Sequence, residues 1–445
     1  KTDNGHEALA SGAMTLADVV EYHNLTPGRS YVMKGRLVDR ETGRAARDDD
    51  GKEITAETMF TAEAANGNTI VIFTFSGTAL AGRSVVAYEG LYRDGKLVAA
   101  HADLTDENQT VHIPKIQTTL EDVMDYNHET LESRSNPFEN AATKNQDASV
   151  SGVIIKTNTV NENHDALASE TTALTDHVRY ENLTVGRKYL LSGVLMDKAT
   201  GEPALDDHGE RITMQLAFIA ETSDGIIDLA FSFSGVSLEG HTVVAFETLY
   251  RDDKVAAVHC ELNDADQSVF LPMIRTTLVD QADSDHDSLA SETITLIDTV
   301  EYHNLLVGRE YTIKGILMDR ETGKAAQDDK GCQITSEATF TAEAAEGSVE
   351  ILFAFCGVSL AGYSVVAFEN LYREDKLAAV HADLYDDGQT VRISEKSRPK
   401  NIFPVRTGDD SNSQAFLIAA FLSLTAFLAA AAAGIYQYKR SKRKP

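Results

Sequence analysis

The sequence predicts an all-β protein made of three tandem β-sandwich domains, followed by a transmembrane helix near the C-terminus. Short runs of alternating apolar and polar residues recur along residues 1–394, with Gly, Asn and Asp turns between them and no long helical period. Many short strands at regular spacing favour a sandwich. One block of sequence also occurs three times, which predicts one domain for each copy.

The repeated block joins a Val-Val-Ala-Tyr/Phe-Glu run to a later segment that contains His, Asp and Gln. The first-copy positions recur 158 residues later (247 minus 89) and 280 residues later (369 minus 89) without any insertion inside the block. The polar positions of the three copies are Glu89, His101, Asp106 and Gln109; Glu247, His259, Asp264 and Gln267; and Glu369, His381, Asp386 and Gln389.

Strand geometry turns part of this pattern inward, because successive side chains of a strand point to opposite faces. Glu89 shares a face with Val85 and Ala87, and Gln109 shares one with Val111. A buried polar group without a partner costs about 1–3 kcal/mol, so three copies that carry both need a reason. Two interpretations are open: a satisfied hydrogen-bond network, or a reactive Gln carboxamide surrounded by Glu, His and Asp.

The remaining elements of each copy follow in a fixed order. A His-Glu/Asp-x-Leu-Ala-Ser segment precedes a long alternating run, which is residues 15–25 in the first copy. Strands are then predicted at 31–37, 55–60 and 69–75, and the Asp-rich residues 48–51 indicate a hairpin tip. This tip lacks the ladder of Asp and Asn ending in Glu that a calcium loop needs, so no metal is expected there.

Composition limits the partners and cofactors. The net charge of −29 argues against nucleic acid as a partner. Three cysteines are too few for a disulfide framework, and no Cys-x-x-Cys pair suggests zinc, so no metal and no cofactor are expected. Cys332 and Cys356 form either a private disulfide of the third unit or, as we expect, two inert thiols. The third cysteine is Cys260.

Spacing between the copies predicts the domain boundaries. The third copy follows the second by 122 residues (280 minus 158), so 36 more residues (158 minus 122) lie between the first two copies. Residues 114–153 contain polar stretches without apolar periodicity and are predicted to be a flexible linker, although 116–120 resemble 274–278. The predicted domains are residues 1–113, 154–273 and 274–394.

The C-terminal region carries the strongest local signal. A polar spacer is predicted at 395–414, an uncharged apolar run at 415–435 is long enough to span a bilayer, and the basic tail at 436–445 is expected on the cytoplasmic side. The spacer contains Phe403, Pro404, Val405, Arg406, Thr407 and Gly408.

This ordered set resembles a sortase cell-wall sorting signal, with cleavage between Thr407 and Gly408. The sequence departs from the usual pattern because two residues, not one, separate Pro404 from Thr407. The resemblance implies sortase and peptidoglycan as partners, a single-pass membrane precursor and a wall-anchored product. A lone membrane anchor is the alternative.

The repeated blocks resemble the VaFE-repeat, or Thr–Gln ester-bond, domains of Gram-positive surface adhesins and pilus-like stalks. The resemblance covers nearly all of residues 1–395 and implies immunoglobulin-like sandwiches. It further implies that a Thr hydroxyl on the first strand attacks a Gln carboxamide on the last and releases ammonia. Glu, with its His and Asp partners, would then manage the proton transfers. The implied ester acceptors are Gln109, Gln267 and Gln389.

The attacking Thr should precede each His-Glu/Asp-x-Leu segment and have apolar neighbours two residues away. Thr276 fits this description in the third unit. For the second unit we predict Thr157, which lies nearer the domain, with Thr118 as the alternative. The first unit requires either Thr2 or a Thr that is absent from this sequence.

Three functions are compatible with these patterns. We expect a wall-anchored structural stalk or adhesin whose domains are locked by self-made esters, and no turnover of an external substrate. The rivals are a surface hydrolase that uses the Glu, His and Asp set, and a ligand-binding adhesin with non-covalent domains. Because the chain begins at Lys1 without Met or a signal peptide, we expect it to be processed or incomplete. A host-surface ligand would then bind an N-terminal region that is absent here.

Overall fold

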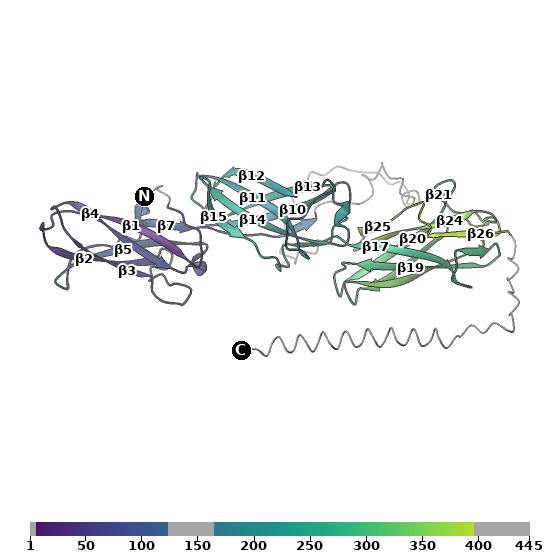
Figure 1. The fold of residues 1–445 in the computed structure, drawn as a ribbon, viewed down its shortest axis with the longest axis horizontal. Helices are drawn as coiled ribbons and strands as arrows, with labels where there is room; N and C mark the ends of the chain where they lie inside the picture. Colours follow the sequence, from purple (N-terminus) through teal and green to yellow (C-terminus); the bar gives the residue numbers. More distant parts are fainter. Residues whose placement is uncertain (1–5, 123–163, 396–445) are drawn as a thin grey trace, which may run out of the picture. The chain divides into compact units, whose positions relative to one another are not determined.

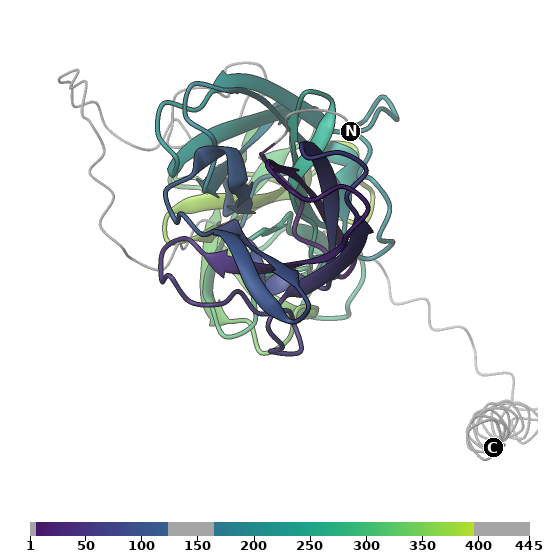
Figure 2. The ribbon, with the colours of Figure 1, turned by 90° about the vertical axis from the view of Figure 1, so that its left-hand side faces the viewer.

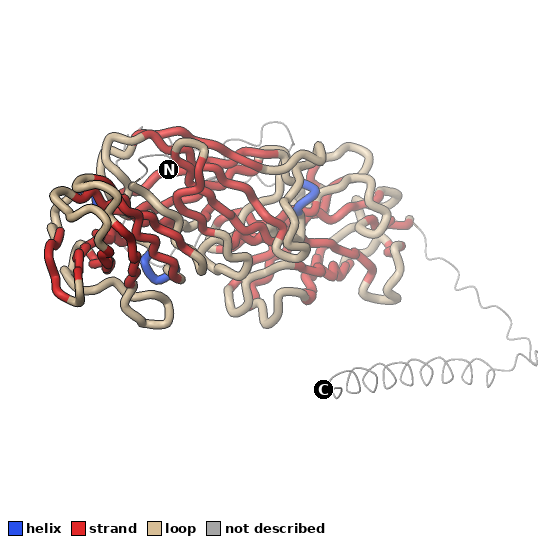
Figure 3. Tube along the Cα trace, turned by 60° about the vertical axis from the view of Figure 1, so that its left-hand side comes forward, coloured by secondary structure: helices blue, strands red, loops and turns tan. Residues whose placement is uncertain are grey.

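The computed structural model describes residues 6–122 and 164–395 and folds them into three β-sandwiches, which confirms the predicted fold class. Strands account for nearly all regular structure, with short 3₁₀ turns between some of them (Figures 1 and 3). No helix within these two ranges is long and apolar enough to cross a membrane, and the predicted span at 415–435 lies outside them. The 3₁₀ turns are η1 (Thr78–Leu80), η2 (Glu107–Gln109) and η4 (Val236–Leu238).

The first sandwich is drawn purple to blue in Figures 1 and 2. Its strands are β1 (Met14–Tyr22), β2 (Ser30–Asp39), β3 (Thr55–Thr61), β4 (Gly67–Phe75), β5 (Arg83–Arg93), β6 (Lys96–His101) and β7 (Thr110–Ile113). One sheet consists of β1 and β4, and the other has the order β3-β2-β5-β6 with β7 also paired to β5. All these pairs are antiparallel.

The second sandwich repeats this plan and has two additional short strands, β8 and β9, that pair with β10. Its strands are β8 (Lys115–Gln117), β9 (Leu120–Asp122), β10 (Thr172–Glu181), β11 (Lys188–Asp197), β12 (Thr213–Ile219), β13 (Gly225–Phe233), β14 (Thr242–Arg251), β15 (Lys254–His259) and β16 (Ser268–Phe270). One sheet has the order β13-β10-β8, with β9 also paired to β10. The other has the order β12-β11-β14-β15, with β16 paired to β14.

The third sandwich has the same two layers. Its strands are β17 (Met273–Asp280), β18 (Asp287–Leu289), β19 (Ile294–His303), β20 (Glu310–Asp319), β21 (Lys324–Ala325), β22 (Thr335–Thr341), β23 (Gly347–Phe355), β24 (Ser364–Arg373), β25 (Lys376–His381) and β26 (Thr390–Ser394). One sheet has the order β17-β19-β23 and the other β18-β26-β24-β20-β21, with β22 on β20 and β25 on β24. The first strand β17 and the last strand β26 therefore belong to opposite layers.

In each sandwich, a glycine on one strand of the larger sheet lets the two sheets approach closely; these strands are β2, β11 and β20. A Cβ at Gly35 of β2 would lie 2.5 Å from the ring of Phe73 on β4, a distance that real Cβ contacts do not show. Gly35 is also the cross-strand partner of Glu89. Gly193 and Gly315 occupy the same place in the other sandwiches, each against a Phe ring. The missing side chain thus makes room for the aromatic core beside the inward Glu.

The Asp-rich tips form turns, as predicted, and one Asp in each tip holds a neighbouring turn. Asp49 accepts hydrogen bonds from the backbone N–H groups of Thr78 and Ala79, at 3.1 and 2.9 Å. In the other sandwiches Asp207 accepts from two backbone N–H groups, and Asp329 accepts from one, that of Ser359. These carboxylates therefore act as caps of irregular backbone, a common use of Asp in turns.

The prediction that residues 114–153 form a linker is wrong for its first part. Residues 115–122 form β8 and β9, which pair with β10, and Ile116 and Leu120 are 3% and 0% exposed. The second domain therefore starts before the predicted residue 154. The extra residues lie inside the domain, since His164 follows Thr118 by 46 positions (164 minus 118) but His286 follows Thr276 by 10 (286 minus 276). Residues 123–163 lie outside the described part of the chain.

Candidate functional site

Each sandwich buries one Glu on the strand that follows the 3₁₀ turn or its equivalent. Glu89 on β5, Glu247 on β14 and Glu369 on β24 are 4%, 0% and 0% exposed. The predicted inward direction of this Glu is confirmed. Strand pairing places it directly across from a His, with Glu89 opposite His101, Glu247 opposite His259 and Glu369 opposite His381.

The Gln immediately before the last strand of each repeat donates to this Glu. The distance from Gln Nε2 to Glu Oε2 is 3.0 Å for Gln109, 2.8 Å for Gln267 and 2.8 Å for Gln389. Gln267 and Gln389 are 0% exposed. The block therefore converges in space as its constant spacing suggested, and the carboxamide lies in a dry interior in the second and third sandwiches.

A Thr completes the cluster in the second and third sandwiches. The Oγ1 atoms of Thr118 and Thr276 each lie 3.1 Å from Oε2 of the buried Glu. Each also contacts Nε2 of the Gln, in the pairs Thr118 with Gln267 and Thr276 with Gln389. A hydroxyl, a carboxamide and a carboxyl group thus meet at one buried point.

The structure places the predicted Thr276 in the cluster, but it corrects the choice made for the second unit. Thr118, the alternative, lies against Gln267, and the preferred Thr157 is outside the described residues. The physical reason is that Ile116 and Leu120, two residues on either side of Thr118, are buried in the core, as Ile274 and Leu278 are around Thr276. Nearness to the domain along the sequence therefore does not identify the Thr that meets the Gln; burial of its neighbours two residues away does.

A second carboxyl group, which the sequence analysis missed, lies beside each Glu. Asp18 on β1, Asp176 on β10 and Asp298 on β19 obey the same offsets of 158 (176 minus 18) and 280 (298 minus 18). Asp176 and Asp298 are 0% exposed. The constant spacing together with the inward alternation of β1 would have identified this Asp, because it shares a strand face with apolar residues.

Burial raises the pKa values of both carboxyl groups, and the neighbouring Asp raises the pKa of the Glu further. Burial, followed by the neighbouring Asp18, raises the pKa of Glu89 to about 8. Burial and the facing Asp raise the pKa values of Glu247 and Glu369 well above the usual range. Burial also raises the pKa of Asp176 to about 7. Since two adjacent carboxylates cannot both ionise cheaply in a dry site, each Asp and Glu pair holds a proton near neutral pH.

The predicted His and Asp residues lie next to one another at the rim of the cluster. The distance from His Nε2 to Asp Oδ2 is 3.4 Å in the first and second sandwiches and 3.6 Å in the third. In the second sandwich the other ring nitrogen of the His faces inward, and His259 Nδ1 lies 3.4 Å from Thr118 Oγ1. These pairs are His101 with Asp106, His259 with Asp264 and His381 with Asp386.

The same Asp also shapes the turn that carries the Gln. Asp106 Oδ1 accepts from the N–H of Asn108 at 2.9 Å, and Asp386 Oδ1 accepts from the N–H of Gly388 at 2.7 Å. Burial lowers the pKa of His381, which keeps its imidazole neutral and able to accept a proton. One carboxylate therefore orients both the base and the acceptor.

The first sandwich has the cluster without a Thr among its described residues. Glu89, His101, Asp106 and Gln109 occupy the predicted places, but His101 is 50% exposed, compared with 18% for His259. Thr2 lies outside the described residues.

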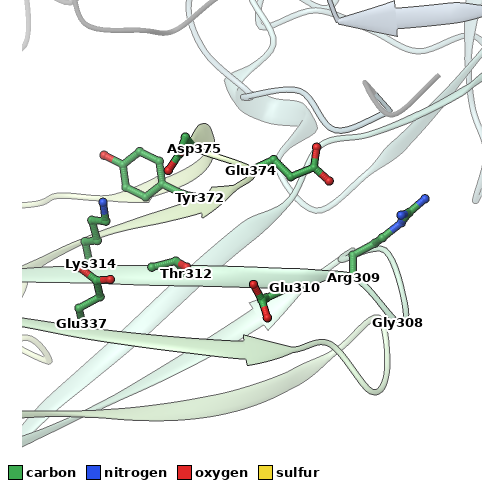
Figure 4. A pocket seen from close by; sticks show the side chains of 9 residues that line it. All are labelled: Gly308, Arg309, Glu310, Thr312, Lys314, Glu337, Tyr372, Glu374 and Asp375. Atoms are coloured by element: carbon green, nitrogen blue, oxygen red, sulfur yellow. The ribbon is translucent and has the colours of Figure 1, made fainter. Parts of the chain in front are cut away.

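Two other features do not belong to this site. The described ranges contain no group of His, Cys, Asp and Glu side chains suited to a metal ion. A surface pocket of about 520 Å³ in the third sandwich is lined by Lys314, Glu337 and Tyr372, among others (Figure 4), and includes none of the cluster residues. Lys314 Nζ lies 5.0 Å from the centre of the Tyr372 ring, which accounts for its position there.

Comparison with known families identifies the chain. The model of the T-Q ester bond containing domain matches residues 1–113, 114–271 and 272–393, so the chain belongs to this family. The second matched segment begins just before β8, in agreement with the corrected boundary. Comparison with curated proteins gave no match.

Several solved structures share a distant likeness. A bacterial adhesin from Mobiluncus mulieris with intramolecular disulfide, isopeptide and ester bond cross-links has 10% identity and a TM-score of 0.23, over 58% of this chain and 80% of that chain. Red sea bream transglutaminase has 11% identity and a TM-score of 0.19, over 52% of this chain and 30% of that chain. Likenesses this distant say nothing about what this chain binds.

Proposed function

We propose that this chain is a structural stalk of a surface protein, in which the second and third sandwiches are locked by self-made esters. The bonds would join Thr118 to Gln267 and Thr276 to Gln389. The observation that carries the proposal is the meeting of a Thr hydroxyl, a Gln carboxamide and a buried pair of carboxyl groups, once in each of these units. Membership of the T-Q ester bond family supports it.

The proton transfers follow from the neighbours of the Thr. Asp264 lies beside Nε2 of His259, which favours the tautomer with hydrogen on Nε2 and leaves Nδ1 free to accept a proton. Nδ1 is 3.4 Å from Thr118 Oγ1, so His259 is placed to remove the hydroxyl proton as oxygen attacks. Such general-base assistance is needed because a neutral hydroxyl is a weak nucleophile.

The leaving group has its own donor. Gln267 Nε2 lies 2.8 Å from Glu247, whose raised pKa keeps a proton available between it and Asp176. Transfer of this proton to the departing nitrogen releases ammonia, and the proton collected by His259 restores the carboxyl pair. The packed core holds both reactants in contact, which replaces a bimolecular encounter by a single intramolecular step.

The position of the bond suits a load-bearing role. Thr276 lies on the first strand β17 of the third unit, and Gln389 immediately precedes the last strand β26. A force applied at the two ends of this unit would pass through the ester and bypass the core. Closing a loop of 113 residues also stabilises the folded state by about 5 kcal/mol in the chain-entropy model.

A surface hydrolase is the weaker candidate for the same residues. Glu247 and Glu369 are 0% exposed, so an external substrate would have to open the core to reach them. Formation of the ester also uses up the Thr and Gln side chains, so the site can react only once. Accordingly, we propose no enzymatic activity on other molecules, and the ligand of an adhesin would bind elsewhere.

Anchoring to the cell wall is a further part of the proposal. Phe403, Pro404, Thr407 and Gly408, the apolar run and the basic tail support recognition by sortase and transfer to peptidoglycan, and they lie outside the described residues.

Intact-mass spectrometry of the purified full chain tests the proposed bonds. Two esters predict a mass lower than calculated by two ammonias. Thr118→Val and Thr276→Val should each reduce this mass deficit by one ammonia. Thr277→Val is the matched control, because Thr277 is the exposed neighbour of Thr276 and should leave the mass deficit unchanged.

A further inference from the structure

The strand that carries Thr118 is interrupted, whereas the strand that carries Thr276 is continuous. In the third sandwich β17 has eight residues and pairs with β19 along its whole length. In the second sandwich β8 and β9 have three residues each and leave Thr118 and Thr119 between them. The connection that follows is also longer, with 46 positions from Thr118 to His164 and 10 from Thr276 to His286. In the chain-entropy model this difference makes docking of the strand about tenfold less favourable.

His177 on β10 lies at this interruption. Its backbone N–H donates to the C=O of Thr119 at 2.9 Å, and its C=O accepts from the N–H of Thr119 at 3.3 Å. Successive side chains of a strand point to opposite faces, so Asp176 points into the cluster and His177 points to the outer face of the sheet. His177 therefore lies beside the attacking Thr118 in the strand ladder, but on the opposite side from the reacting groups.

Both ring nitrogens of His177 contact carboxylates of the two neighbouring strands. Nε2 contacts Oε1 of Glu121 on β9, and Nδ1 lies 2.6 Å from Oδ1 of Asp228 on β13. A carboxylate only accepts hydrogen bonds, so two such bonds require a proton on each ring nitrogen, which is the imidazolium form. The side chains of His177 and Glu121 are 14% and 12% exposed, and that of Asp228 is 62% exposed. The contact with Glu121 is therefore the stronger of the two, because water screens the exposed pair.

We call His177, Glu121 and Asp228 the outer clamp, and the charges around it favour protonated His177. The hydrogen bond to Glu121 is the largest influence and raises the pKa of His177 above its usual 6.5, burial opposes it, and Asp228 adds to it. On the same strand, Asp176 is a further acidic neighbour, and Arg179 has an ion pair of its own. Because the folded-state pKa is raised, the clamp is complete below pH 6.5 and is lost as pH rises through the raised value.

The third sandwich achieves the same strand position with different side chains. Thr299 takes the place of His177 (177 plus 122). Val279 takes the place of Glu121 (121 plus 158, the offset that relates the two attacking Thr residues). The outer clamp thus occurs in the unit whose Thr strand is interrupted and has the longer connection. It supplies a contact that the continuous strand β17 does not need.

We propose that protonated His177 is a positioning residue for the ester of the second sandwich. By holding Glu121 of β9 between β10 and β13, it would keep Thr118 against Gln267 until the bond forms. The inference rests on the ester chemistry proposed above and adds no reactant to it. His177 neither gives nor takes a proton in that reaction, since its two ring protons stay in the bonds to the carboxylates.

The test follows both esters in the same chain. The full chain is isolated under denaturing conditions, folded by dilution into detergent buffer, and sampled over time by peptide mapping. His177→Thr, which introduces the residue of the third unit, should slow formation of the ester of Thr118 about tenfold and leave that of Thr276 unchanged. His208→Thr is the matched control, because His208 is an exposed His on a turn of the same sandwich, and it should change neither rate.

The pH profile distinguishes positioning from a purely structural role. In the wild-type chain, the rate of the second-sandwich ester relative to the third should fall as pH rises from about 6 to about 9, because His177 loses its proton. His177→Arg, which keeps a positive charge throughout this range, should remove the dependence and retain the wild-type rate at low pH.

The possible outcomes separate this inference from the proposed function. If neither ester forms in the wild-type chain, the proposed function fails and the inference fails with it. If both form and His177→Thr leaves the ratio of their rates unchanged, only the positioning role is overturned. A ratio that falls equally with pH in the wild type and in His177→Arg would overturn that role as well. A slower second ester in His177→Thr together with a flat profile in His177→Arg supports it.

Discussion

Thr276→Val should convert the third sandwich from an inextensible element into one that unfolds under force. The substitution keeps the size of a β-branched side chain on β17 but removes the hydroxyl that would form the ester with Gln389. In the wild-type chain, pulling from the two termini would load the covalent bond between the first and last strands. In the variant, the load reaches the hydrogen bonds and the core.

The magnitude follows from the positions of the linked residues. Thr276 and Gln389 are 113 positions apart. At about 3.6 Å for each extended residue, opening this loop adds about 400 Å of contour length. The corresponding separation of Thr118 and Gln267 is 149 positions, or about 540 Å.

Single-molecule force spectroscopy on the full chain measures these steps directly. The wild-type chain should show one unfolding event, from the first sandwich, and Thr276→Val should add a second event of about 400 Å. Thr277→Val serves as the control and should match the wild type. An unfolding step of this length in the wild-type third sandwich would refute the assignment of the ester as the load path.

Three further predictions concern the first sandwich and the anchor. The raised pKa of Glu89, about 8, means that the folded unit binds a proton that the unfolded chain releases near its ordinary pKa. Its denaturation midpoint should therefore fall as pH rises from about 4.5 to 8, and Glu89→Gln should flatten this dependence, which equilibrium unfolding at several pH values measures. Gly35→Ala should destabilise this unit by about 1–3 kcal/mol because its Cβ would meet the ring of Phe73, whereas Gly12→Ala, with open space around it, should not. Thr407→Ala should leave the protein in the membrane fraction, and its recovery with peptidoglycan would exclude Thr407 as the sortase site.

Much of the fold and of the site was predictable because the repeat supplies internal comparison. Constant offsets placed Glu369, His381 and Gln389 in equivalent positions, and strand alternation predicted that the Glu and Gln point inward. The apolar neighbours of Thr276, two residues away on each side, identified it as the attacking Thr of the third unit. All four residues meet within the third sandwich, as the hydrogen bonds of Glu369 and the strand register show.

Distance along the chain is a poorer guide to the attacking Thr than the pattern of apolar neighbours two residues away. Thr118 lies 46 residues before His164 (164 minus 118), so nearness along the chain favours Thr157 although Thr118 is the residue in the cluster. The entropic cost of closing a loop grows only slowly with its length, so a long insertion between two paired strands is tolerated. Apolar periodicity predicts the strand around Asp176, and only the repeated acidic position shared by Asp18, Asp176 and Asp298 indicates the second carboxyl group.

The intact mass of the purified full chain tests the central claim most directly. The account predicts a deficit of two ammonias, with one ester mapped to Thr118 and Gln267 and the other to Thr276 and Gln389. The double variant Thr118→Val, Thr276→Val should have its full calculated mass. A wild-type chain of full calculated mass, with both Gln residues recovered as free carboxamides, would contradict the account.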